Sequence, residues 1–287
     1  MIVAVASGKG GTGKTTVAVN LVKSAGLPVQ LLDCDVEEPN AHLFIGGLPN
    51  LLETVCVPVP EIDLLLCDGC GACSQFCAYH AIVGLKATPL VFPELCHGCG
   101  GCSRVCPRQA IRETKRRIGL VEAVVSGKVT LIQGRLDVGV PNAPPLIRRV
   151  KAYLRKDQLA LLDAPPGISC PVVTTLRGVD YVVLVTEPTP FGLHDLQLIV
   201  ELVRKLGLPF GVVVNRVGIG GERVHAFCRH EGIPILLEIP EDRRIAEACS
   251  RGKLVVDAIP EYRGVFSGLL ARLEQQAERA AARWTFC

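Results

Sequence analysis

The stretch of sequence that decides the fold is IVAVASGKGGTGKTTVAVNLVK, residues 2–23. Its apolar start predicts a buried strand over Ile2–Ala6, and the residues after the glycines predict a helix over Lys14–Ala25. Between them, residues 8–15 (GKGGTGKT) match the G-x-x-x-x-G-K-[ST] pattern of a phosphate-binding loop. A glycine-rich turn that matches by chance is the alternative, but the flanking strand and helix supply the context that the pattern requires.

This loop has the chemistry that a nucleoside triphosphate needs. Glycines let backbone N–H groups turn inward around an anion, and the helix N-terminus adds positive potential. Lys14 can reach the outer phosphates, and Thr15 can ligate Mg²⁺. We therefore expect ATP or ADP to bind with Mg²⁺. The residues expected to contact the nucleotide here are Gly8, Gly10, Gly11, Thr12, Gly13, Lys14, Thr15 and Thr16.

An alternation of strands and helices extends through most of the chain and predicts an α/β fold with a doubly wound, mainly parallel sheet. The strands expected after Ile2–Ala6 are Val29–Asp33, Leu159–Asp163, Tyr181–Thr186, Phe210–Asn215 and Ile235–Ile239. The helices expected between them lie near Leu193–Lys205, Glu222–Glu231 and Arg243–Arg251. Other expected elements are a hairpin (Gly119–Val125 with Lys128–Gly134), a proline-rich loop (Pro141–Pro145) and a terminal helix (Arg263–Arg283) with one face on the core.

Composition narrows the class of protein. Of the 287 residues, 49% are hydrophobic and 21% charged, which favours a well-buried globular chain over a disordered one. The net charge of +3 is too small to indicate a nucleic-acid partner. The N-terminus lacks the pattern of a signal peptide, and no apolar run is long enough to span a membrane. We therefore expect a cytoplasmic protein, in which 14 cysteines indicate metal binding.

Most of these cysteines lie in a segment that repeats itself. CDGCGACSQFCAYHAI, from Cys67, aligns with CHGCGGCSRVCPRQAI, from Cys96. Each copy contains C-x2-C-x2-C-x3-C, the run found in bacterial ferredoxins, where the fourth cysteine ligates the cluster of the other copy. We expect two [4Fe-4S] clusters in a small ferredoxin-like α+β insert. The chain then divides into a first core part (1–60), the insert (61–115) and a second core part (116–287).

The resemblance to bacterial ferredoxins implies two crossed ligand sets. The first is Cys67, Cys70, Cys73 and Cys106, and the second is Cys96, Cys99, Cys102 and Cys77. The first copy has Ala78 where the ferredoxin run usually has proline, which bears on the stiffness of that loop rather than on its ligands. Structural zinc and a disulfide framework are the alternatives. Zinc sites separate their C-x2-C pairs by longer spacers than these, which favours the clusters.

The string SGKGGTGKTT (residues 7–16) resembles the deviant Walker motif of the MinD, ParA, Mrp and nitrogenase iron-protein group. The resemblance implies that Lys9 reaches the nucleotide of a second subunit, so that the active unit is a homodimer with two bound ATP molecules. A solvated loop lysine is the alternative interpretation of Lys9. The catalytic residues expected on this basis are Lys9, Lys14, Asp35 and Asp163.

Two acidic strand ends resemble the switch regions of that group. The resemblance implies that Asp35 orients the attacking water, with Asp33 near the Mg²⁺ shell, although acids at strand ends are often caps or solvated groups. Asp163 matches the second switch and is expected to hold Mg²⁺ through water, and Gly167 to offer its N–H to the γ-phosphate. With Thr15, these three acids are the expected Mg²⁺ residues. Cys170 follows this loop, and because no second thiol is near, we expect it to pack rather than to bind a cluster.

Four further residues resemble the part of the group that surrounds the adenine. Asn215 and Arg216 end an expected strand, and Pro240 and Glu241 begin the base-enclosing loop. A surface position is an equal alternative for Arg216. An amide side chain can both donate to and accept from an adenine edge, which favours Asn215.

The position of the insert, between the two switches, suggests that nucleotide turnover acts on the clusters. The preferred hypothesis is ATP-gated electron transfer to a redox partner. An iron-sulfur cluster carrier related to Mrp scaffolds, with a cluster-accepting partner, is the alternative, although the C-x-x-C of those scaffolds is missing here. A MinD- or ParA-like positioning ATPase is the third class considered, and the mixed charge of the terminal helix disfavours it.

Overall fold

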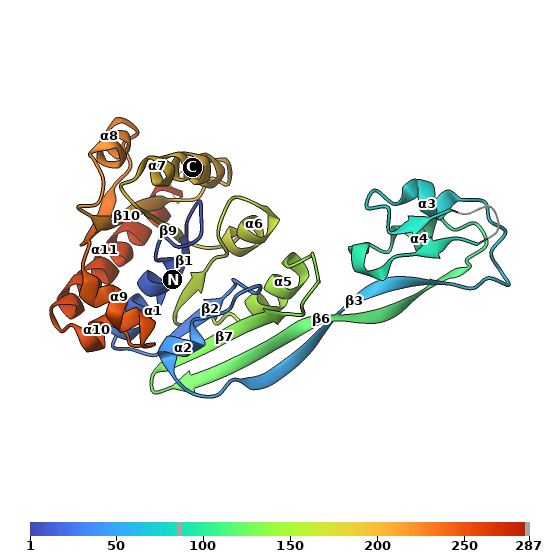
Figure 1. The fold of residues 1–287 in the computed structure, drawn as a ribbon, viewed down its shortest axis with the longest axis horizontal. Coiled ribbons are helices and arrows are strands. Elements are labelled where there is room, and N and C mark those ends of the chain that lie inside the picture. Colours follow the sequence, from blue (N-terminus) through green and yellow to red (C-terminus); the bar gives the residue numbers. More distant parts are fainter. Residues whose placement is uncertain (85–87, 285–287) are drawn as a thin grey trace.

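The computed structural model describes residues 1–84 and 88–284, and for residues 277–284 it describes the backbone alone. A nine-stranded sheet has the order β11-β10-β9-β1-β8-β2-β7-β6-β3 (Figure 1). Its strands are β1 (Ile2–Ala6), β2 (Val29–Asp33), β3 (Asn50–Ile62), β6 (Ile111–Ser126), β7 (Val129–Leu136), β8 (Leu159–Asp163), β9 (Tyr181–Thr186), β10 (Phe210–Val217) and β11 (Ile235–Pro240). Neighbours from β11 to β7 are parallel, and β6 and β3 are antiparallel additions. The prediction of a mainly parallel α/β sheet is confirmed.

Helices cover both faces of the parallel strands. One face carries α1 (Lys14–Ser24), α2 (His42–Ile45), α9 (Arg243–Ser250), α10 (Val255–Ala258) and α11 (Glu261–Trp284). The opposite face carries α5 (Pro144–Ala152), α6 (Cys170–Leu176), α7 (Pro190–Lys205) and α8 (Arg223–His230). Strands covered on both faces are largely aliphatic, and in β1 every residue is aliphatic and buried. This layering brings the carboxyl ends of β1, β2 and β8 together at one edge.

Helix α5 differs in detail from the sequence-based expectation, and α11 agrees with it. Pro144 and Pro145 occupy the first turn of α5 rather than a loop, because proline fits the first helical positions, where no N–H is needed. In α11, Phe266, Leu269 and Leu273 are buried on the core, as expected. The predicted face continues to residues 277–284, whose side chains lie outside the described part of the chain. Within the described residues, no helix combines the length and the hydropathy needed to span a membrane.

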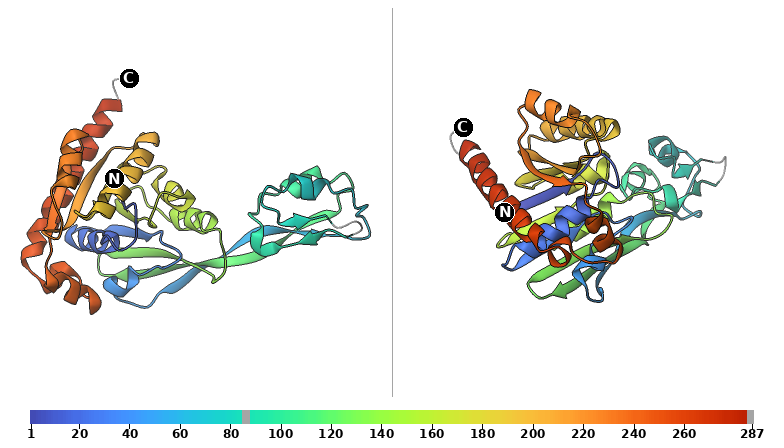
Figure 2. Two further views of the ribbon diagram at one scale, coloured as in Figure 1. Left: turned by 45° about the horizontal axis from the view of Figure 1, so that its top comes forward. Right: turned by 60° about the vertical axis from the view of Figure 1, so that its left-hand side comes forward.

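Strands β3 and β6 extend beyond the sheet as an antiparallel ribbon that ends in a small module (Figure 1). Figure 2 shows the same arrangement after rotation, with the module held away from the sheet by the two strands. Strand β3 was not predicted, and it contains Pro58 and Pro60. The structure explains them, because β3 is the edge strand, where a missing N–H costs no ladder bond. The limits predicted at residues 61 and 115 fall within the ribbon strands, so the three-part division stays a prediction.

We call residues 63–110 the cysteine-rich module. It contains α3 (Ala72–Phe76), α4 (Gly101–Val105), a 3₁₀ turn (Pro93–Leu95) and the two-stranded β4 (Ile82–Val83) and β5 (Leu90–Val91). The two sequence repeats have the same local structure. In each, a glycine in the left-handed region (Gly71, φ 78°; Gly100, φ 68°) precedes a short helix that carries the third cysteine of its run.

Candidate functional site

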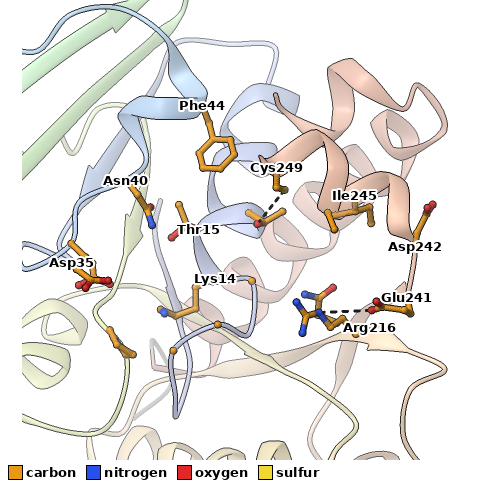
Figure 3. Close-up of a pocket in the computed structure, with 18 of the residues that line it drawn as sticks. Lys14, Thr15, Asp35, Asn40, Phe44, Arg216, Glu241, Asp242, Ile245 and Cys249 are labelled. Atoms are coloured by element: carbon orange, nitrogen blue, oxygen red, sulfur yellow. Dashed lines mark hydrogen bonds and ion pairs between the residues drawn. The ribbon is translucent and has the colours of Figure 1, made fainter. Parts of the chain in front are cut away.

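The predicted phosphate-binding loop joins β1 to α1 and lies on a cavity of about 380 Å³ (Figure 3). Loop residues and predicted base-binding residues line this cavity together. They are Gly10, Gly11, Gly13, Lys14, Thr15, Thr16, Asn215, Arg216, Pro240 and Glu241. The strands that end at this edge of the sheet therefore bring residues from both halves of the chain to one site.

Two other loop residues support the cavity rather than line it. The carbonyl oxygen of Thr12 accepts a hydrogen bond from the Asn215 amide nitrogen at 2.9 Å, which ties the loop to β10. Gly8 lies against α7, and a Cβ added to Gly8 would be 2.1 Å from the carbonyl oxygen of Asp195. Only glycine fits this close approach of two backbones.

Asp163 is the acid best suited to hold a metal. It ends β8 directly opposite Asp33 of β2, and it is fully buried. Within the described residues, neither of its carboxylate oxygens has a hydrogen-bond partner. Burial raises the pKa of Asp163 to about 6, while Thr15 and Lys14 act in the opposite direction. A buried, unpartnered carboxylate beside these two residues fits an Mg²⁺ ion bound with a nucleotide.

Asp33 and Asp35 differ in their surroundings. The Asp33 carboxylate accepts backbone N–H groups of Asp35, Asn40 and Ala41, each at 3.1 Å, so it shapes the loop after β2. Burial, followed by the charge of Asp163, raises the pKa of Asp33 well above its ordinary value. Asp35 lines the nucleotide cavity, and burial raises its pKa to about 6 against the effect of Lys14. Asp35 is thus the acid placed to face a bound nucleotide.

A carboxylate that sequence reasoning missed joins two of the predicted residues. Glu187 follows β9, is 6% exposed, and lies 3.4 Å from the Lys9 ammonium and 3.0 Å from the Arg216 guanidinium. Arg216 has a left-handed backbone (φ 56°) and is 3.8 Å from Glu241. Lys9 is therefore held within its own chain in this structure. A single acid after an apolar strand carries no sequence signal for such a pairing.

Gly167 and Cys170 lie in and just after the loop that resembles the second switch, and the prediction for Cys170 needs correction. The N–H of Gly167 donates to the carbonyl oxygen of Ser7 at 3.0 Å, so it must leave this bond before it can contact a phosphate. Cys170 begins α6 and is exposed. The expectation that Cys170 packs in the interior is wrong, because the start of α6 faces solvent.

The cysteine-rich module contains two cavities, and each is lined by cysteines of one predicted set. One cavity is lined by Cys67, Cys70, Cys73 and Cys106. The other is lined by Cys77, Cys96, Cys99 and Cys102. In each cavity three thiols come from one repeat and the fourth from the other repeat.

The donor sets suit a cluster better than a single ion. Within the described part of the chain, no three cysteine, histidine or acidic side chains converge closely enough to hold one metal ion. Cysteines of a [4Fe-4S] cluster bind four separate irons and so stand farther apart than the ligands of one zinc ion. The described cysteines are free thiols rather than disulfides. The four thiols around each cavity therefore match the number and type of ligands that the predicted cluster needs.

Comparison with known proteins identifies the family. The family model described as "CobQ/CobB/MinD/ParA nucleotide binding domain" matches residues 3–255. This chain belongs to that family. It therefore has the nucleotide-binding domain of a MinD/ParA-type ATPase, which implies ATP or ADP with Mg²⁺ at the cavity described above.

Three similar proteins illustrate the range of the family. An uncharacterised protein of Methanocaldococcus jannaschii is 34% identical, with 84% of this chain and 87% of that protein covered. An iron-sulfur cluster carrier protein of Aquifex aeolicus is 25% identical, with 91% of this chain and 63% of that protein covered. The MinD structure of Pyrococcus horikoshii with Mg-ADP has a TM-score of 0.62 at 22% identity, covering 97% and 98% of the chains, and it supports the fold alone.

Proposed function

We propose that this family member holds two [4Fe-4S] clusters and uses ATP binding and hydrolysis to gate electron transfer from them to a partner protein. The observation that carries the proposal is the pair of cysteine cavities, at the end of the β3–β6 ribbon, in the same chain as the nucleotide cavity. Crossing the fourth ligands ties both repeats into one unit, which favours retaining the clusters over releasing them.

On the nucleotide side, each residue has a separate task. Lys14 and the loop N–H groups bind the phosphates, and Thr15 and Asp163 hold Mg²⁺, which supplies charge neutralisation at the transferred phosphoryl group. Asp35 orients the attacking water, and ATP is cleaved to ADP and phosphate. Lys9 leaves Glu187 to reach the nucleotide of a second copy, so the active form is a homodimer. A Lys9→Ala variant should lose the rise of specific ATPase activity with protein concentration; an unchanged rate would refute the trans role.

On the redox side, the clusters supply one-electron chemistry when bound. A low-potential one-electron donor would provide each electron, and a redox protein would accept it. The backbone N–H of Gly98 donates to the Cys96 sulfur at 3.4 Å, and that of Ala110 donates to the Cys106 sulfur at 3.3 Å. Such contacts help to set the potential.

The alternative function is a cluster carrier, favoured by the similarity, at 24–25% identity, to iron-sulfur cluster carrier proteins of Aquifex aeolicus and Pyrococcus abyssi. One experiment separates the two functions. Cluster-loaded protein, reduced with dithionite and freed of excess reductant, is mixed with an apo-ferredoxin or with a redox acceptor, with and without MgATP. ATP-dependent reduction of the redox acceptor, with no loss of iron from the donor, supports electron transfer. Iron appearing in the apo-acceptor supports the carrier and overturns our proposal.

The crossed ligand sets have a test of their own. A Cys106→Ser, Cys70→Ser double variant alters one proposed set, whereas Cys106→Ser with Cys99→Ser alters both. The first should keep about half of the iron and the second almost none, because each cluster needs its four thiols. Ligand sets confined to one repeat would reverse this order. Iron content and visible absorbance after anaerobic reconstitution provide the measurement.

A further inference from the structure

The ribbon changes its geometry where it leaves the sheet. Strand β6 pairs with β7 from Gly119 onward, and before Gly119 it pairs only with β3. The register of β3 and β6 shifts at the same point: Val55 is opposite Gly119 and Cys56 is opposite Arg117, which leaves Ile118 as the extra residue of a β-bulge. A bulge bends its strand and increases the local twist. The direction in which the ribbon carries the module is therefore set around Ile118.

The segment after β7 holds this bulge in place. The N–H of Asp137 donates to the carbonyl oxygen of Ile118 at 2.9 Å. The Arg117 guanidinium donates to the Asp137 carboxylate, also at 2.9 Å. Asp137 thus contacts Ile118 through its backbone N–H, and it contacts Arg117, the residue before Ile118, through its carboxylate.

The same segment is joined to the loop that carries Asp35. The N–H of Leu136 donates to the carbonyl oxygen of Val36 at 2.8 Å, and Val36 directly follows Asp35. The Val36 side chain is 1% exposed and lies against β7, since a Cβ on Gly134 would be 2.5 Å from it. A displacement of the Asp35 loop therefore acts directly on Leu136 and on Asp137 beside it.

The other strand of the ribbon is joined to the second switch. Arg149 of α5 makes two-pronged hydrogen bonds, at 2.8 and 2.9 Å, with Glu53 of β3. Lys151, on the same helix, donates to the carbonyl oxygens of Thr175 and Arg177 at the end of α6. Helix α6 follows the Asp163–Gly167 loop, so each ribbon strand is tied to one switch.

A cavity lies between the Asp35 loop, the segment after β7 and the Asp163–Gly167 loop. This cavity, of about 710 Å³, is lined by Asp35, Glu37 and Glu38 from the first switch, by the segment 136–141, and by prolines of the second switch. The loop segments around it can shift without displacing the packed core. Asp137, which contacts both Ile118 and Arg117, lines this cavity.

We propose that Asp137 and Arg117 are positioning residues that carry the nucleotide state of the Asp35 loop to the bulge at Ile118 and so set the orientation of the cysteine-rich module. This inference rests on the proposed function, because it says how ATP acts on the clusters. The route has two steps: the hydrogen bond of Leu136 with Val36, and that of Asp137 with Ile118.

Hydrogen exchange followed by mass spectrometry tests this route in the full-length, cluster-loaded protein. MgATP is compared with MgADP in the wild type, in Arg117→Gln and in Asp137→Asn. The matched control is Arg112→Gln, which removes an ion pair with Glu61 (3.1 Å) on the same ribbon but at the module end. Thermal unfolding of each variant verifies that it folds. The segments compared are residues 33–40 and 111–119.

We expect ATP to change exchange in both segments of the wild type and of Arg112→Gln. In Arg117→Gln and Asp137→Asn the change should persist at residues 33–40 and be lost at residues 111–119. A wild-type response in both variants at residues 111–119, or an equal loss in Arg112→Gln, overturns the route. Electron delivery is measured separately in the wild type and in both variants. Gating that survives in both variants refutes the route through Asp137 and Arg117 alone, and a response at residues 111–119 without any gating refutes the proposed function alone.

Discussion

Replacing Asp163 with asparagine should stabilise the nucleotide-free protein while it removes ATPase activity. Asp163 is fully buried and has no hydrogen-bond partner among the described residues. Burial raises its pKa from the ordinary value of 3.8 to about 6. Because each tenfold change in proton affinity is worth about 1.4 kcal/mol, holding this carboxylate ionised costs up to about 3 kcal/mol at pH 7.5. An asparagine of similar shape removes that cost.

The sign of the pH dependence follows from the raised pKa. The folded protein binds the proton more tightly than the unfolded chain does, so the destabilisation is absent below pH 3.8 and complete above about pH 6. At pH 5 the folded wild type is already largely protonated at Asp163. The advantage of Asp163→Asn should therefore fall to about half of its value at pH 7.5.

Urea unfolding followed by far-ultraviolet circular dichroism, without nucleotide or added Mg²⁺, measures this difference. Asp157→Asn, the same change at an exposed residue in the loop before β8, is the control and should stay within about 0.5 kcal/mol of the wild type. Excess MgATP should reverse the order, since only the wild type keeps its metal ligand and gains binding energy. An Asp163→Asn protein that is less stable than the wild type at pH 7.5, or whose gain is the same at pH 5, would refute the reasoning.

Two further substitutions test the site. Gly8→Ala should lower the melting temperature and abolish nucleotide binding, because its Cβ would lie 2.1 Å from the carbonyl oxygen of Asp195, whereas Gly10→Ala has open space and should keep the fold; equal melting temperatures would contradict this. Glu187→Gln should weaken ATP binding about fivefold, measured by calorimetry, since Arg216, which lines the nucleotide cavity, loses the carboxylate 3.0 Å away, and a partly exposed ion pair is worth about 1 kcal/mol; unchanged affinity would count against a role for Glu187.

Local patterns were sufficient for the parallel part of the fold. Strands such as Ile2–Ala6 and Tyr181–Thr186 are covered on both faces, so they are mostly apolar and the run is visible in the sequence. The phosphate-binding loop was equally predictable, because its glycines and Lys14 are adjacent in the chain. The cavities that bring each set of four cysteines together agree with the repeat spacing, although the ligand sets themselves stay predictions.

The missed features depend on contacts between distant residues. Strand β3 contains Pro58 and Pro60, and only its place at the sheet edge makes them compatible with a strand. Glu187 is significant because β9 ends beside Lys9 and Arg216, which are 178 and 29 residues away in the chain. The bulge at Ile118 comes from the pairing of two strands, which neither strand shows alone.

A ribbon differs physically from a flexible linker as a way to attach the cysteine-rich module. A flexible linker would let the module take many orientations and would carry no displacement from the nucleotide site. A two-stranded ribbon fixes direction, but by itself it is only marginally stable in water. Ion pairs lie at both ends of this ribbon, Arg112 with Glu61 and Arg117 with Asp137. Because the pair at the base also touches the switch-linked segment, a small rotation there becomes a larger displacement at the far end, where the cysteines lie.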